Sequence, residues 1–126
     1  MEKYDPSRKL NPEDWLALDE YERILLVRGF HDAEESDLEE NGKELHALIH
    51  VIVENQIAME VVPVPETANK LTRQGLDRHE VIHAIGAVLS EDIFNLMKGN
   101  IAEFSPKKYR RKLEKLTAKR WKKGQY

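Results

Sequence analysis

The segment 41–62, NGKELHALIHVIVENQIAMEVV, constrains the fold more than any other part of this chain. Apolar residues occupy most of its helical wheel, and a helix that is apolar on nearly all sides must be buried. Pro63-Val64-Pro65 follows it, and proline cannot continue an α-helix. The sequence therefore predicts a long central helix, against which the remaining elements pack.

Two histidines lie on the apolar face of this predicted helix. His46 and His50 are four residues apart, so they sit one above the other on adjacent turns. The segment 77–97 repeats the pattern with His79 and His83, so four of the five histidines fall in His-x-x-x-His pairs. Imidazole is the commonest metal ligand in proteins, and this spacing can direct two nitrogens at one ion. The four histidines are therefore the candidate metal ligands.

Three consecutive polar residues, Glu54, Asn55 and Gln56, interrupt the buried segment. Buried polar groups need hydrogen-bond partners. Glu54 lies one turn after His50, which makes it a fifth candidate: either a metal ligand or a hydrogen-bond partner of the histidines.

The chain contains no cysteine, so any metal must be held by His, Asp or Glu side chains. Four histidines with one carboxylate suit zinc, iron, manganese or nickel, and copper stays open. Glu80-x-x-His83 also resembles half of the di-iron pattern of helical bundles. Positions three residues before His46 and His50 are not Glu, so a mononuclear site is the stronger prediction.

Helix-start signals divide the rest of the chain into helices, and no alternating strand pattern is found. The expected helices begin at Asn11-Pro12, at the Asp19–Glu22 capping box, at the Asn41–Glu44 capping box, near Pro65, at the Asp77–Glu80 capping box and at Ser105-Pro106. Residues 1–10 are expected to be loose and 32–40 to form a loop or a frayed helix. The prediction is an all-α compact bundle of five or six helices, with 41–62 and 77–97 at its centre.

Charge divides the chain into an acidic body and a basic end. Residues 1–104 hold 10 Lys or Arg and 22 Asp or Glu, a formal charge of −12, whereas 105–126 hold 10 Lys or Arg and one Glu. We expect a helical core domain over 1–104 and a basic helix over 105–126 that packs on it or extends from it. Nucleic-acid binding through 106–123 is an alternative role for this helix.

The position of the histidine pairs sets a geometric condition. In a simple hairpin of the two long helices, His79 would lie near Val62, roughly 24 Å from His46 at 1.5 Å per residue. The short helix 66–74 must therefore carry the chain back, so that the two long helices run roughly parallel or cross near the histidines. Otherwise a second subunit could supply one pair, so a homo-oligomer stays open. His31, near the end of its helix, is an outside candidate ligand and is more typical of a surface residue.

Two other functions compete with metal binding. His79-Glu80-Val81-Ile82-His83 matches the H-E-x-x-H pattern of zinc hydrolases, in which Glu80 would act as general base. Glu80 is equally explained as the third residue of a capping box. Alternatively, the histidines are hydrogen-bonded core residues of a purely structural or interaction domain. Whether the protein is an enzyme stays open.

No segment approaches the roughly 18 apolar residues of a membrane span, and MEKYDPSRKLNPEDW lacks the apolar core of a secretion signal. A soluble, cytoplasmic protein is the expectation.

The segments LHALIHVIVENQIA and GLDRHEVIHAIGAVL together resemble an uncharacterised bacterial family of small conserved hypothetical helical proteins. The shared pattern is His-x-x-x-His, then Glu and Gln one to two turns on, then a second His-x-x-x-His that opens a later helix. On that resemblance the motif positions are His46, His50, Glu54, Gln56, His79 and His83. The resemblance covers about 41–97 and implies a small helical fold without implying an activity.

Overall fold

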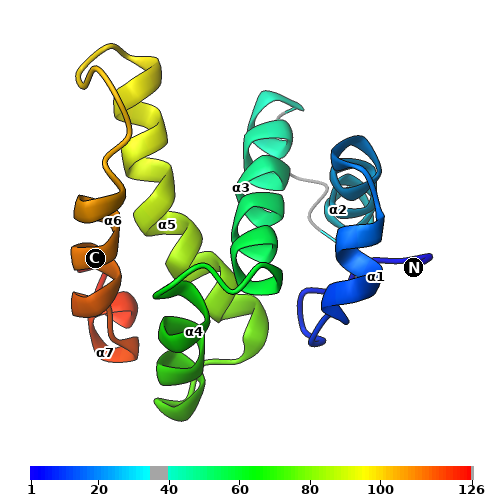
Figure 1. Ribbon diagram of the computed structural model, residues 1–126, viewed down its shortest axis with the longest axis horizontal. Coiled ribbons are helices and arrows are strands. Elements are labelled where there is room, and N and C mark those ends of the chain that lie inside the picture. The colour runs from blue at the N-terminus through cyan, green and yellow to red at the C-terminus, as the bar shows by residue number, and fades with distance from the viewer. Residues whose placement is uncertain (35–39, 126) are drawn as a thin grey trace.

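The computed structural model describes residues 1–34 and 40–125, without the side chains of 34 and 40–43, and this part of the chain forms helices and no strands (Figure 1). The helices are α1 (Pro12–Ala17), α2 (Glu20–Glu34), α3 (Glu40–Ala58), α4 (Val64–Arg73), α5 (Arg78–Met97), α6 (Pro106–Lys115) and α7 (Ala118–Lys122). The all-α bundle is confirmed. None of the described helices combines the length and the apolar character needed to cross a bilayer.

The described residues contain seven helices where five or six were expected, because the basic C-terminal segment forms two. Leu116 ends α6 in an extended conformation and is buried. Thr117 then caps α7, since its hydroxyl accepts a hydrogen bond from the Arg120 backbone N–H at 3.1 Å.

The central helix is also shorter than predicted, because α3 ends at Ala58 rather than at Val62. Glu60 takes a positive φ of 54°, and the Val61 N–H donates to the Gln56 carbonyl at 2.9 Å. This is the hydrogen bonding of a Schellman motif, with Glu60 in the place that glycine usually takes. The helix is therefore closed by its own backbone before the prolines are reached.

Two of the predicted capping boxes lie among the described residues. Asp19 accepts from the Glu22 N–H at 2.8 Å and Glu22 accepts in return at 3.2 Å, so that capping box is confirmed. Asp77 caps α5 by accepting from the Glu80 N–H at 2.9 Å. Residues 32–34 belong to α2 and residue 40 begins α3, so the predicted loop or frayed helix over 32–40 is helical at both ends. Its residues 35–39, and the Asn41 side chain on which the third capping box depends, lie outside the described residues.

Helix α3 lies at the centre, with α1 and α2 on one side and α5 on the other (Figure 1). It contributes to two separate apolar cores. Ile49 and Val53 belong to a core shared with α4, α5 and α6, while Ala47 and Val51 belong to one shared with α1, α2 and the N-terminal segment. This arrangement agrees with the nearly all-round apolar character of the segment.

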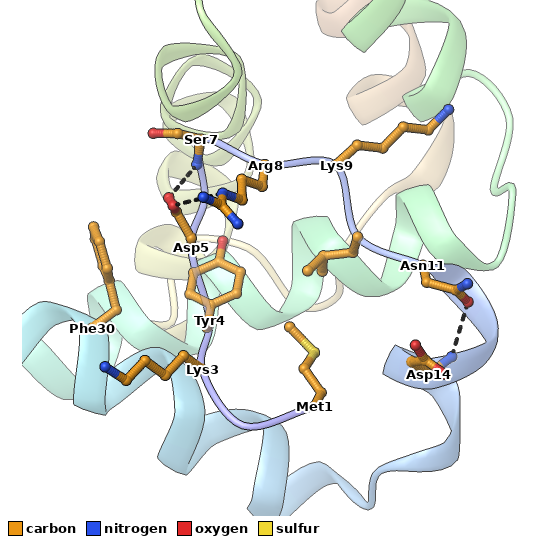
Figure 2. Close-up of a pocket in the computed structure, with 11 residues that line it drawn as sticks. Met1, Lys3, Tyr4, Asp5, Ser7, Arg8, Lys9, Asn11, Asp14 and Phe30 are labelled. Carbon is orange, nitrogen blue, oxygen red and sulfur yellow. Dashed lines mark hydrogen bonds and ion pairs between the residues drawn. The ribbon is translucent and has the colours of Figure 1, made fainter.

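The N-terminal segment is not loose, contrary to the prediction. Tyr4 is 4% exposed, and its ring packs against Trp15 and Phe30 at centroid distances of 5.9 and 6.1 Å. This segment lines a pocket of about 760 Å³. Figure 2 shows Asp5 accepting a hydrogen bond from the Ser7 N–H and forming an ion pair with Arg8. The prediction considered polarity alone, whereas the segment is ordered by one buried aromatic side chain.

The three polar residues of α3 are satisfied, as expected. Each connects α3 to a different part of the molecule: Glu54 bonds Arg78 of α5 and Tyr4, Asn55 bonds Trp15 of α1 and Arg23 of α2, and Gln56 bonds Tyr109 of α6. Hydrogen bonds of buried groups require specific partners, so this run fixes how the outer helices are placed around α3.

The basic C-terminal segment packs on the bundle. Tyr109, Leu113 and Leu116 are buried in the core shared with α4 and α5. Lys112 forms an ion pair with Asp92 of α5 at 2.9 Å. The other cations of α6 and α7 are largely exposed, and nucleic-acid binding through 106–123 stays a prediction.

Gly86 of α5 lies in close contact with Ile49 of α3. A Cβ atom built on it would lie 2.7 Å from Cγ2 of Ile49, too close for any normal contact. Gly86→Ala should therefore lower the free energy of unfolding by about 1–3 kcal/mol, despite the helix-propensity gain of alanine. Urea denaturation would measure this change.

Gly29 of α2 is the matched control, because nothing lies within 4 Å of a Cβ built there. Gly29→Ala should leave stability unchanged or raise it by up to about 1 kcal/mol. Equal effects of the two substitutions would contradict the close-approach argument.

Candidate metal centre

All five histidines of the chain meet at one place, between α2, α3 and α5. Ring centroids of neighbouring pairs lie 4.3 to 5.6 Å apart. His50 contacts every other member, and His31, His46, His83 and His79 form an arc around it. We call these five residues the histidine cluster.

The two predicted pairs meet in antiparallel register. His46 lies against His83 at 5.0 Å, and His50 lies against His79 at 5.6 Å, measured between ring centroids. Helix α3 ends eight residues after His50, and α4 connects it to the start of α5 (Figure 1). His79, the second residue of α5, therefore contacts His50. The four histidines thus meet within one chain, with α3 and α5 in antiparallel register rather than roughly parallel.

His31 belongs to this cluster, contrary to its interpretation as a surface residue. Its side chain is 0% exposed, and its ring lies 4.4 Å from that of His46 and 4.6 Å from that of His50. Val27, one turn earlier on the same face of α2, is equally buried. The 27/31 spacing was a usable signal, because residues four apart on a helix share a face.

Two groups of three histidines have the separations of a metal site. His31, His46 and His50 form one group, and His50, His79 and His83 the other; within each group the ligand nitrogens lie within 4.8 Å of one another. Tetrahedral zinc with bonds of 2.0–2.1 Å needs nitrogens about 3.3 Å apart. The Nε2 atoms of His50 and His83 are 3.1 Å apart, so this pair already has that spacing.

A chain of hydrogen bonds orients His50 from behind. Arg78 binds both carboxylate oxygens of the fully buried Glu54, at 2.7 and 2.9 Å. The Tyr4 hydroxyl donates its proton to a Glu54 carboxylate oxygen at 2.6 Å. The hydroxyl oxygen of Tyr4 lies 3.0 Å from Nδ1 of His50. Because Tyr4 has one proton and gives it to Glu54, His50 must donate from Nδ1. The lone pair of His50 is thereby placed on Nε2, which faces His83.

This tautomer allows His50 to bind one ion at a time. His50 is common to both groups, and its Nδ1 is occupied by Tyr4. The single lone pair on Nε2 can serve one metal at a time. The two groups therefore could not each hold an ion through His50 at once.

Glu54 belongs to neither group of ligand nitrogens and oxygens among the described residues. Both of its oxygens accept hydrogen bonds from Arg78 or Tyr4. The strong charge and hydrogen bonds of Glu54 outweigh the effect of burial on Arg78 and raise the pKa of that guanidinium. Glu54 thus acts on the cluster through Tyr4 rather than by direct contact.

Three imidazoles of the cluster, those of His31, His50 and His83, are neutral near pH 7. Burial, reinforced by the neighbouring histidines, lowers the pKa of His31 and of His83 to about 4, and lowers that of His50 further. Burial also raises the pKa of Tyr4, which keeps its donor proton. Metals bind neutral imidazole, so His31, His50 and His83 are in their ligand form without first losing protons.

No family model, curated protein or solved structure matches this chain. The described residues hold imidazoles that could bind a metal ion, and nothing in the comparisons assigns an activity.

The positions of the H-E-x-x-H residues add no support to the zinc-hydrolase hypothesis. Glu80 is exposed, and its backbone N–H is bonded to the Asp77 side chain at the start of α5. His79 and His83 do lie side by side, at 4.3 Å between centroids. Their approach is explained by the cluster, whereas Glu80 takes the capping position foreseen for it.

Tyr4 and Arg78 are the participants that the sequence interpretation did not identify. Tyr4 stands alone in a polar segment with no periodic neighbour. Arg78 directly follows the α5 cap and precedes His79. The demand of buried Glu54 for a cation was the usable signal for Arg78, since buried carboxylates are usually paired.

Acid should destabilise the metal-free protein through protonation of His31 and His83. Their folded-state pKa lies below the unfolded value of 6.5, so the unfolded chain binds more protons below that pH. Stability is therefore fully present above pH 6.5 and declines as the pH falls toward 4, by up to about 3 kcal/mol for one histidine shifted this far. Urea unfolding from pH 7.5 to 4.5, with a chelator present, would measure the slope.

His31→Phe is the control for this slope, since it keeps an aromatic ring without a proton-binding site. The variant should show a shallower decline between pH 6.5 and 4 than the wild-type chain. A pH profile identical to wild type would show that His31 does not contribute.

Proposed function

We propose that this protein binds one divalent transition-metal ion in the histidine cluster. His50 supplies Nε2, and two further imidazoles complete a three-histidine set, either His31 with His46 or His79 with His83. The single observation that carries the proposal is the meeting of five imidazoles from three helices in one cluster, with two groups of three at ligand separations. Core histidines that merely fill space need no such grouping.

The orientation of His50 adds support. Metal-bound histidines usually donate their second nitrogen to a carboxylate or another acceptor, which fixes the ring and raises its basicity. His50 has this arrangement through Tyr4 and Glu54. A neutral core imidazole could use a simpler partner, so the three-residue chain behind it favours a ligand role.

The donor set favours zinc, nickel or iron over manganese. Every candidate ligand is an imidazole nitrogen, and the nearby carboxylate of Glu54 is bound to Arg78 and Tyr4. Imidazole suits zinc, copper, iron and nickel, whereas manganese prefers oxygen donors.

Elemental analysis of protein purified without a histidine tag tests the proposal. We expect about one equivalent of bound metal, in line with a mononuclear site. The double variant His46→Ala/His83→Ala breaks both groups and should lose the metal. Its matched control is Leu48→Ala/Glu91→Ala, which alters exposed positions of the same two helices and should retain it. Wild-type protein that takes up no zinc, nickel, iron or copper on reconstitution would overturn the proposal.

A further inference from the structure

A cavity of about 370 Å³ opens beside the histidine cluster, between α3, α5 and α7. Its lining includes His46, His50 and His83, whereas His31 and His79 lie outside it. Leu45, at its rim, is 39% exposed, so the cavity reaches the surface. The cluster is thus open to small molecules from one side.

The walls of this cavity are mostly apolar. Ile49 and Ile82 line it together with Ala87 and Trp121, and Ser90 is its one hydroxyl. Among the residues that the structure describes, no Asp, Glu, Lys or Arg takes part in the lining. Such walls favour a neutral apolar group, because nothing there would compensate a buried charge.

Ala87 leaves this space open. It lies four residues after His83, so it shares the face of α5 that carries that imidazole. A methyl side chain at this position leaves room directly beside His83, whereas the place of a Gly86 Cβ is taken by Ile49. A cavity of this size is typical of small-molecule sites, which range from about 300 to 1,000 Å³.

We propose that the cavity binds a small ligand with a metal-coordinating head group and a neutral apolar tail about the size of one aromatic ring. The head group would take an exchangeable coordination position on the ion, on the side where His46, His50 and His83 face the cavity. Metal sites that act on ligands keep such a position open, whereas structural sites are closed. This inference rests on the proposed metal binding.

Cobalt(II)-loaded protein and a pair of imidazole probes provide the test. 4-Methylimidazole and 4-phenylimidazole carry the same donor nitrogen and differ in the size of the apolar tail. Both should change the visible absorption of bound cobalt, and the phenyl compound should bind about tenfold more tightly because its ring is buried in the cavity.

Ala87→Phe fills the cavity without altering a ligand. It should retain cobalt and lose the preference for the phenyl probe. Ala102→Phe makes the same change at an exposed position after α5 and should keep the preference. Should Ala87→Phe fail to fold, Trp121→Ala removes one apolar wall and should lower the preference several-fold.

The outcomes separate the two proposals. Protein that binds no cobalt overturns both metal binding and the cavity site. Protein that binds cobalt, yet shows no spectral response to the probes or equal affinity for the two, overturns the cavity site alone. The same follows if the phenyl preference survives both Ala87→Phe and Trp121→Ala.

Discussion

Replacing His50 with alanine is expected to reduce metal affinity at least about 100-fold, more than any other single histidine substitution. His50 is the one residue common to both three-histidine groups. Its loss leaves two ligands in each group, and it also disconnects the cluster from Tyr4 and Glu54. Loss of one hydrogen-bond partner behind a ligand alone typically lowers affinity 10–100-fold. Competition with a chromophoric chelator would measure the dissociation constants of zinc and nickel.

His31→Ala and His79→Ala are the matched comparisons. Each removes one buried or half-buried imidazole of the cluster but leaves the other three-histidine group complete. We expect an affinity loss of about tenfold for each, because a three-ligand site persists. Circular dichroism would establish that all three variants keep their helices. An affinity of His50→Ala equal to that of His31→Ala would refute the central role of His50.

Much of the fold follows from local rules that the sequence displays. The caps at Asp19 and Asp77 are short-range hydrogen bonds, so they could be recognised from residues three apart. The central position of α3 follows from its apolar circumference. At Gly86 the reason for glycine is a tertiary contact, because a Cβ built there would lie 2.7 Å from Cγ2 of Ile49 in α3.

The elements that were predicted wrongly depend on distant contacts. Tyr4 is ordered by α1, α2 and α3, none of which is adjacent to it in the chain. The division between α6 and α7 at Leu116 arises because this side chain turns into the core shared with α4 and α5. No window of a few residues contains that information, since tertiary packing overrides local propensity.

The candidate site was partly visible in the same way. Helical spacing identified the four histidines of α3 and α5, because each pair lies within one helix. Spacing could not rank them, so the central position of His50 became evident when α2 and α5 were placed around it. Glu54 was noted as a ligand or partner, and its actual contacts depend on Tyr4 and Arg78.

Removing Arg78 should destabilise the protein more than any other single charge substitution in the described residues. Glu54 is 0% exposed and receives two of its hydrogen bonds from this guanidinium, which also donates to the Pro6 carbonyl at 3.0 Å. Truncating one partner of a buried ion pair leaves an uncompensated charge and costs about 3–5 kcal/mol. Arg78→Ala should lower the urea midpoint accordingly.

Arg73→Ala is the matched control, since Arg73 is exposed at the end of α4 and surface substitutions usually change stability by less than about 0.5 kcal/mol.

Adding Glu54→Gln to Arg78→Ala removes the buried charge and should recover part of the lost stability. The double variant should still bind metal less tightly than wild type, because a neutral amide attracts the Tyr4 proton less than a carboxylate does. Recovery of stability without recovery of affinity would separate the two roles of Glu54: closing the fold around Arg78 and orienting His50 through Tyr4. An Arg78→Ala variant as stable as Arg73→Ala would contradict the first role.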